Sequence, residues 1–232
     1  EHEVAKIFED HDLLSAAVVD KDGILLGRIT IDDVVDVIRD EADDSVLNMA
    51  GLNKEDDIFA PIIQSTKRRT LWLGANLVTA ILAAAAIGIF EATIEKIVTL
   101  AILMPIVASM GGIAGMQSLA LVIRSQATNQ IGSSNSKLLI LKESAIGVLN
   151  GILWSSVVSI AVYLWFDSVF LGVVIAVALL VNLIIGAISG VTLPLILKKL
   201  NIDPAIAGGV ILTTITDIVG FISLLGVATL IM

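Results

Sequence analysis

One carboxylate, Asp217, lies deep inside an apolar stretch of the sequence. It is the fourteenth residue of a stretch that begins at Pro204, so a helical rise of ~1.5 Å per residue carries it about 20 Å into a membrane. A carboxylate at that depth costs on the order of 3 kcal/mol, and it should face a protein interior or a water-filled path. Gly209, Thr213 and Gly220 share its helical face at spacings of three and four. The alternative is an aspartate that hydrogen-bonds to a neighbouring helix for structure alone.

A second apolar stretch contains Pro105 and a glycine-rich run, residues 110–118, that includes Gly112 and Gln117. Proline and clustered glycine weaken helical hydrogen bonding and let backbones approach closely. The run therefore suits either tight helix packing or a segment whose carbonyls line a pore. Packing is the interpretation for the glycines spaced four apart: Gly111 and Gly115, Gly147 and Gly151, Gly186 and Gly190.

Two further polar side chains lie in or beside apolar stretches. Glu143 stands at the expected cytoplasmic start of one stretch, where a carboxylate favours the N-terminus of a helix. Asn182 lies inside the apolar stretch of residues 168–197, and the sequence assigns it no function.

The elements that position these residues follow from composition. The chain has 232 residues, 56% of them hydrophobic, with a mean hydropathy of +0.96, which is too apolar for an ordinary soluble domain. Five apolar stretches reach the ~20 residues that a spanning helix needs: residues 70–90, 97–124, 143–166, 168–197 and 204–232. The sequence predicts an all-α membrane protein with five transmembrane helices and a small α/β segment at its N-terminus.

Charge separates the chain into two parts. Residues 1–69 hold 17 of the 23 acidic and 8 of the 14 basic residues, so the net charge of −9 belongs to the first third. An acidic soluble part argues against nucleic acid as a partner and favours cations, of which a divalent metal is the simplest. The absence of cysteine excludes disulfides, thiolate zinc sites and cysteine nucleophiles.

Basic residues mark alternate ends of the apolar stretches. Lys67, Arg68 and Arg69 precede the first stretch, which marks that end as cytoplasmic. Five more bases fall at ends predicted to be cytoplasmic: Arg124, Lys137, Lys142, Lys198 and Lys199. The opposite ends carry Glu91, Glu95 and Asp167 against Lys96 alone. The sequence thus predicts a plasma (inner) membrane protein with a cytosolic N-terminus and an external C-terminus; no cleavable signal sequence is expected.

Residues 13–39 predict a strand, an Asp-x-x-Gly turn, a second strand and a helix capped by Thr30 or Asp32. Residues 1–40 resemble the second half of a CBS module, which implies that the sequence begins inside a longer protein. The resemblance also implies an ATP-type nucleotide contact at Thr30 and Asp33, at which this sequence supplies only half of the module. Residues 41–69 predict an acidic connecting helix, broken near Gly51 and Pro61. Its candidate regulatory metal ligands are Asp40, Glu41, Asp43 and Asp44.

Three segments together resemble the MgtE family of magnesium channels and transporters: residues 105–124, Asp203-Pro-Ala, and residues 213–220. The resemblance implies a homodimer in which the second and fifth helices of both chains surround a pore. It implies that Asp217 is the pore acid and that the Thr213 carbonyl faces the ion. Gly209 and Gly112 are further candidate pore residues. It further implies that Glu91 lies at the outer mouth and that Asp203 takes part, with the connecting helix, in sensing magnesium.

Two departures from the family pattern stand beside these pore positions. The family's Gly-Gly-Asn-x-Gly-Asn-Gln-Ser becomes Gly-Gly-Ile-Ala-Gly-Met-Gln-Ser at residues 111–118, and Gly209 and Val210 replace an Asn-Pro of some relatives. Two apolar side chains thus replace two amides beside Gly112. The resemblance consequently favours divalent cation transport more firmly than magnesium itself.

Magnesium keeps several waters and takes one or two carboxylates, which two copies of Asp217 across a dimer axis would provide. Cytosolic metal that bridges the clustered acids would favour a closed state. A secondary transporter that exchanges the divalent ion for H⁺ or Na⁺ is the alternative. An enzyme is not expected, because no second acid, histidine or cysteine partners Asp217 at depth.

Overall fold

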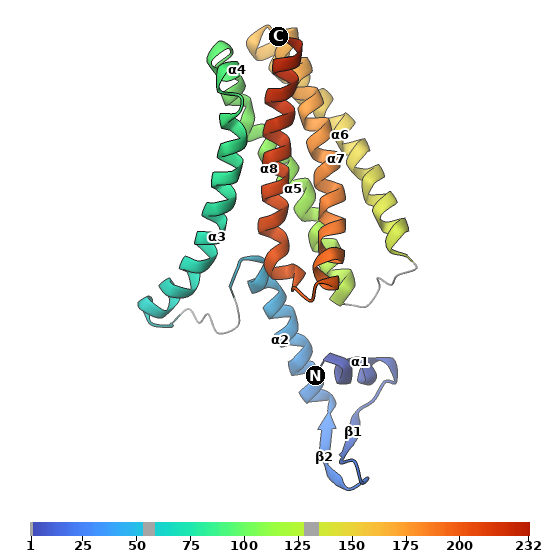
Figure 1. Ribbon diagram of the computed structural model, residues 1–232. Coiled ribbons are helices and arrows are strands. Elements are labelled where there is room, and N and C mark those ends of the chain that lie inside the picture. Colours follow the sequence, from blue (N-terminus) through green and yellow to red (C-terminus); the bar gives the residue numbers. More distant parts are fainter. Residues whose placement is uncertain (1, 53–58, 128–134) are drawn as a thin grey trace. The chain divides into compact units, whose positions relative to one another are not determined.

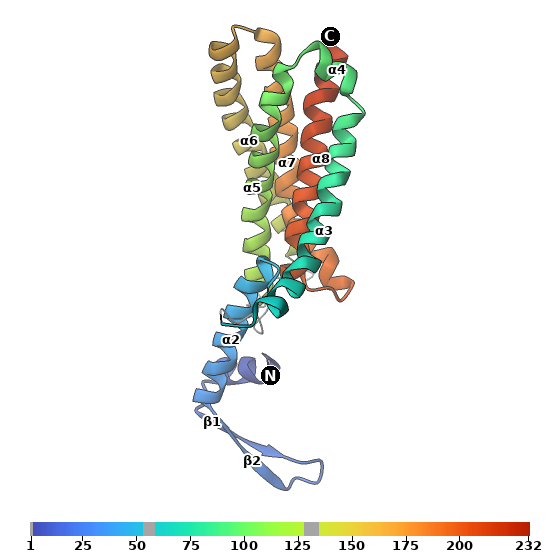
Figure 2. The ribbon, with the colours of Figure 1, turned by 90° about the vertical axis from the view of Figure 1, so that its left-hand side faces the viewer.

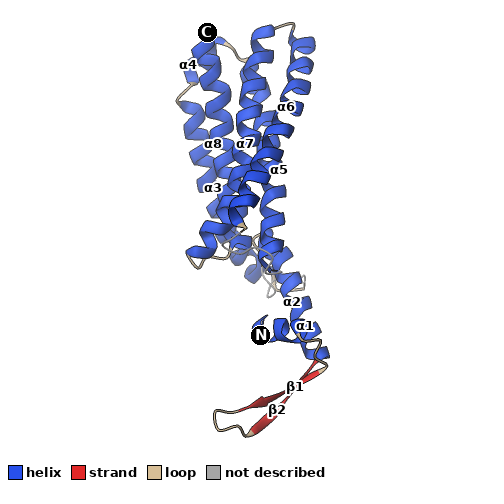
Figure 3. Cartoon of the chain, turned by 90° about the vertical axis from the view of Figure 1, so that its right-hand side faces the viewer, coloured by secondary structure: helices blue, strands red, loops and turns tan. Residues whose placement is uncertain are grey.

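The computed structural model describes residues 2–52, 59–127 and 135–232, with the backbone alone at residues 2, 41, 42, 45, 68 and 127. These residues form two compact units, residues 1–66 and 67–232, which are described separately. Helices dominate the chain and strands occur only in one N-terminal hairpin among the described residues (Figure 3).

The N-terminal unit contains α1 (His2–Asp10), β1 (Ser15–Val19), β2 (Leu25–Thr30) and α2 (Ile31–Met49). The strands pair antiparallel with Ser15 opposite Thr30 and a register shift after Val18. At the turn, the Asp20 carboxylate accepts hydrogen bonds from the backbone N–H groups of Asp22 and Ile24, and Gly23 has a φ of 80°. The predicted strand, turn, strand and helix are therefore confirmed, whereas α1 was not predicted.

A small core holds α1 against α2 and the hairpin. Ala5, Phe8 and Val34 are buried in it. Thr30 is the N-cap of α2, and the Asp33 carboxylate accepts hydrogen bonds from the Thr30 backbone N–H at 2.9 Å and hydroxyl at 3.0 Å. This capping box satisfies donors that the first turn would otherwise leave open. The helix continues through residue 40 without a break and ends before Gly51, whose φ is 73°.

The second unit is a bundle of long helices (Figure 1). Its elements are α3 (Ile62–Gly88), α4 (Glu91–Lys96), α5 (Thr99–Ala127), α6 (Ser136–Phe166), α7 (Val169–Lys199) and α8 (Pro204–Ile231). Among the described residues, five of these helices are long and apolar enough to cross a membrane, and α4 is too short. The prediction of five spans is confirmed. The short α4 was not predicted, and α6 begins earlier than its apolar stretch.

Successive long helices run in opposite directions, so the C-terminus lies at the α4 end of the bundle (Figures 1 and 2). The turn between α6 and α7 is tight: Asp167 ends α6 with a left-handed φ of 47°, and the Ser168 hydroxyl caps α7 by accepting a hydrogen bond from the Leu171 N–H. Aspartate tolerates the left-handed conformation better than most residues. Two residues therefore suffice to reverse the chain.

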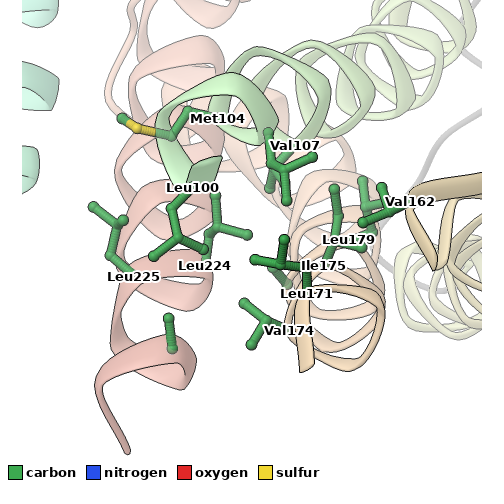
Figure 4. Close-up of a cluster of buried hydrophobic side chains, with 13 residues drawn as sticks. Leu100, Met104, Val107, Val162, Leu171, Val174, Ile175, Leu179, Leu224 and Leu225 are labelled. Atoms are coloured by element: carbon green, nitrogen blue, oxygen red, sulfur yellow. The ribbon is translucent and has the colours of Figure 1, made fainter. Parts of the chain in front are cut away.

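The core of the bundle is centred on α7, which packs against α5, α6 and α8. Figure 4 shows Leu100 and Val107 of α5, Ile175 of α7 and Leu224 of α8 converging in one apolar cluster. Glycines allow the close crossing of α5 and α7: a Cβ on Gly186 would lie 2.6 Å from the Gly111 carbonyl oxygen. The glycines of α6 likewise face α7, so the predicted packing role of the glycine pairs is confirmed. By contrast, α3 has only Ala83 and Ala86 buried among its apolar residues.

Candidate functional site

The carboxylate of Asp217 is positioned by α8, whose start is fixed by its first residues. Asp203 is the N-cap and accepts a hydrogen bond from the Ala205 N–H at 2.8 Å, and Pro204 occupies the first turn. Proline suits this position because its missing N–H would have no helical partner. From there α8 continues unbroken past Asp217 to Ile231. One turn before Asp217, the Thr213 hydroxyl donates to the backbone carbonyls of Gly209 and Val210, each at 3.1 Å.

Asp217 and Thr213 line a cavity of about 650 Å³ between α8 and α5. The α5 residues that line it are Ala108, Ser109, Gly112, Ile113, Met116, Gln117 and Ala120. The structure thus brings together three of the predicted pore residues: Asp217, Thr213 and Gly112. Gly209 is not part of this lining, although a Cβ there would lie 3.8 Å from the sulfur of Met116.

The chemistry of the lining is uneven. Asp217 is the only ionisable side chain in it, and oxygen donors come from Thr213, Ser109 and Gln117. Carboxylate, hydroxyl and amide oxygens are the ligands that hard divalent cations take, commonly through retained waters. The other side chains of the lining are apolar. Such a wall offers a hydrated cation one strong anchor and few groups that could replace its water.

Six α5 residues of the lining were not predicted as site residues: Ala108, Ser109, Ile113, Met116, Gln117 and Ala120. Sequence periodicity could have indicated them, because they recur with Gly112 at helical spacing and because Ser109 and Gln117 are polar side chains within an apolar stretch.

The predicted outer and regulatory acids lie elsewhere. Glu91 is exposed in the short α4, outside the cavity lining. That helix is joined to α8 by a 2.7 Å hydrogen bond between the Thr93 and Thr229 hydroxyls. Asp40 and Asp43 are exposed on α2, Asp44 is partly exposed, and the side chain of Glu41 is outside the described set. Within the described residues, no three acids or histidines gather as a metal-binding group.

Thr30 and Asp33 bond to each other in the capping box of α2. Both groups therefore serve the start of this helix. Their assignment to a nucleotide remains an untested prediction.

Glu143 requires a correction. It does not stand at a helix start, because α6 begins at Ser136, about two turns earlier. The Glu143 side chain is 5% exposed and accepts a hydrogen bond from the Ser118 hydroxyl of α5 at 2.9 Å. Sequence hydropathy placed the helix start too late because the first turns of α6 mix Lys137 and Lys142 with leucines.

Comparisons with known proteins show which family this chain resembles. A family model named MgtE and described as a divalent cation transporter matches residues 104–227, from α5 to α8. The magnesium transporter MgtE of Bacillus subtilis is 35% identical over 229 residues, which are 99% of this chain and 51% of that protein. Magnesium transporters MgtE of Enterococcus faecalis and Thermus thermophilus are 32% and 30% identical over the whole chain, covering 51% and 52% of their lengths. The chain spans about half the length of these relatives.

Proposed function

Because this chain belongs to the MgtE family of divalent cation transporters, we propose that it carries a divalent cation, most simply Mg²⁺, along the cavity between α5 and α8. The observation that carries the proposal is the presence of Asp217 in this cavity, at mid-length of a membrane-spanning helix. An ionisable side chain at that depth is expensive unless it serves an ion or a water-filled path.

Asp217 would attract the ion and Thr213 would help to orient its waters. Coulomb attraction scales with ion charge, so the carboxylate favours a dication over Na⁺ or K⁺ at the same distance. Mg²⁺ releases its waters reluctantly, which fits a lining with few oxygen donors. Glu91, at the α4 end of the bundle, is proposed as an acid of the outer mouth.

A homodimer is proposed from the exposure of the cavity wall. Ser109, Ile113 and Gln117 are exposed in the single chain, and Ile113 retains 56% of its accessible surface. Serine and glutamine at membrane depth are poorly placed against lipid. A second copy packed over this face would enclose the cavity with two α5 and two α8 helices and bring a second Asp217 to the path.

The proposed orientation places the end of the bundle opposite α4 in the cytosol. Arg124 lies in the last turn of α5 and Lys198 and Lys199 in the last turn of α7. Basic residues of this kind favour the cytosolic side. Cytosolic Mg²⁺ bound by the acids of α2 would then favour a closed state when the ion is abundant, because metal relieves repulsion between carboxylates. Asp203 is proposed as a further regulatory acid. We propose no nucleotide site, since Thr30 and Asp33 already bond to each other.

The second candidate function is a carrier that exchanges the divalent ion for H⁺ or Na⁺. One observation favours it: Glu143 is a second carboxylate buried in the membrane unit, with the neutral Ser118 as its hydrogen-bond donor. Buried carboxylates within membrane segments mark ion pathways and proton relays in transporters. Transport that stops when the proton and sodium gradients are abolished would favour the carrier over a channel.

Uptake of Mg²⁺ into liposomes tests the function. Asp217→Asn keeps the shape of the side chain and removes its charge, so uptake should fall at least tenfold, while folding and assembly survive. Asp167→Asn is the matched control, because Asp167 is exposed at the turn between α6 and α7 and asparagine tolerates its left-handed backbone. Equal uptake by the two variants would remove Asp217 from the transport path.

A further inference from the structure

Asn182 is a fully buried amide in the middle of the membrane unit. It lies on α7, is 0% exposed, and its Nδ2 donates a 2.8 Å hydrogen bond to the backbone carbonyl of Val107 on α5. Only the nitrogen of the amide can donate to a carbonyl, so this bond fixes which way the side chain is turned. Among the described residues, the Asn182 Oδ1 has no hydrogen-bond partner.

The amide is bracketed by two glycines from the helices that line the cavity. A Cβ on Gly111 of α5 would overlap the Asn182 amide, lying 2.5 Å from Cγ. A Cβ on Gly220 of α8 would lie 2.8 Å from Nδ2. The side chain of Asn182 therefore occupies the point where α5, α7 and α8 meet, and both cavity helices lack a side chain there.

These contacts lie directly behind the cavity wall. Gly111 precedes Gly112, which lines the cavity, and Gly220 follows Asp217 by three residues on α8. Across the wall, a Cβ on Gly112 would lie 3.8 Å from the Thr216 hydroxyl of α8. A shift of α5 or α8 at Asn182 would consequently move Gly112 relative to Asp217.

Packing alone does not explain an amide at this position. An apolar side chain of similar size would fill the same space without leaving a buried acceptor unpaired, which is costly. The feature that the amide adds is a directional bond between α7 and the backbone of α5. Val107 belongs to the apolar core, where its neighbours supply dispersion contacts and no directional restraint (Figure 4).

We propose that Asn182 is a positioning residue of the transport path. Its hydrogen bond to the Val107 carbonyl and its contacts with Gly111 and Gly220 fix the spacing of α5 and α8. This spacing in turn sets the distance between Gly112 and Asp217. This inference rests on the proposed function of Asp217. Asn182 does not touch the ion.

Asn182→Leu keeps the number and branching of the side-chain heavy atoms and removes the hydrogen bond. In liposomes, Mg²⁺ uptake should fall at least tenfold and the half-saturating Mg²⁺ concentration should rise. The unfolding temperature should stay at or above the wild-type value, because leucine removes the unpaired Oδ1. Asn150→Leu is the matched control, since Asn150 is exposed on α6. A space-filling role predicts unchanged uptake, and a role in folding alone predicts uptake lost in proportion to stability.

The spacing itself is measured by disulfide trapping, which the absence of native cysteine leaves free of background. A Cβ on Gly112 would lie 3.8 Å from the Thr216 hydroxyl oxygen. Cysteines in the variant pair Gly112→Cys and Thr216→Cys would therefore bring their sulfur atoms close to one another, as a disulfide requires. Oxidation should cross-link this pair readily in the otherwise native chain and several-fold more slowly when Asn182→Leu is added. If Asn182→Leu fails to fold, the same uptake and cross-linking measurements are made on Asn182→Ala, which removes the amide without adding bulk.

Unchanged uptake and unchanged cross-linking in a folded Asn182 variant would overturn the inference. Asp217→Asn measured in parallel separates this outcome from failure of the proposed function. Normal uptake by Asp217→Asn would refute the transport path, whereas lost uptake by Asp217→Asn with normal uptake by Asn182→Leu would refute the positioning role alone.

Discussion

Replacing Gly111 by alanine should destabilise the bundle, whereas the same change at its neighbour Gly112 should not. The added Cβ at Gly111 lies 2.5 Å from Asn182 Cγ, about 1 Å inside ordinary contact, and Asn182 is held by its bond to Val107. Overpacking of a core costs about 1–3 kcal/mol, and loss of the displaced hydrogen bond costs about 1 kcal/mol. The expected destabilisation is about 2–4 kcal/mol.

A chain of this size changes its unfolding temperature by roughly 2–4 °C per kcal/mol, so Gly111→Ala should unfold about 4–16 °C lower than wild type. At Gly112 the nearest atom to an added Cβ is the Thr216 hydroxyl at 3.8 Å, an ordinary contact. Alanine also favours a helix by about 1 kcal/mol over glycine, so Gly112→Ala should be as stable as wild type or more so.

Thermal unfolding of the purified variants in one detergent provides the assay, with Mg²⁺ uptake as the second readout. Gly112→Ala should reduce uptake despite its stability, because its methyl group enters the cavity. Equal unfolding temperatures for the two alanine variants would refute the close packing of α5 on α7 as described.

Three further predictions concern acids outside the cavity. Ser118→Ala should lower stability by about 1–3 kcal/mol, because it leaves the buried Glu143 carboxylate without its hydrogen-bond donor. Adding Glu143→Gln to this variant should raise its unfolding temperature again. No recovery would argue against the Ser118–Glu143 pair. Asp203→Ala should cost about 1 kcal/mol of stability, because the N-cap of α8 is lost. Asp203→Asn should keep the cap and weaken the inhibition of uptake by internal Mg²⁺. A purely structural role of Asp203 would leave this inhibition unchanged. At the start of α2, the neighbouring Thr30 side chain, together with the backbone N–H groups of the first turn, holds the pKa of Asp32 below its usual range. The stability that this interaction adds is present above the ordinary aspartate pKa of ~3.9 and is lost as pH falls through the lower pKa of the folded state. Amide hydrogen exchange in the first turn of α2 should therefore become faster in acid. Thr30→Val should weaken this dependence on pH.

The sequence was sufficient to predict the five spans and the N-terminal strands, because hydropathy and turn residues are local signals. Helical spacing put Asp217 and Thr213 on one face of a helix, and Gly112 was a candidate pore residue on another; the structure has all three in one cavity lining. The family resemblance is confirmed by the comparisons. The sequence could not place Asn182 or Glu143, since their roles depend on contacts with residues 75 and 25 positions away. Periodicity along one helix does not reveal which helix covers each face.

The most direct test of the central claim locates a divalent ion in the protein. Mn²⁺ can replace Mg²⁺ at oxygen ligands and scatters anomalously, so crystals of the protein grown with Mn²⁺ would reveal its position. The account predicts an anomalous peak in the cavity between α5 and α8, within about 4–5 Å of the Asp217 carboxylate if one water intervenes, and its loss in Asp217→Asn. Mn²⁺ bound only at the acids of α2, with none beside Asp217, would contradict it.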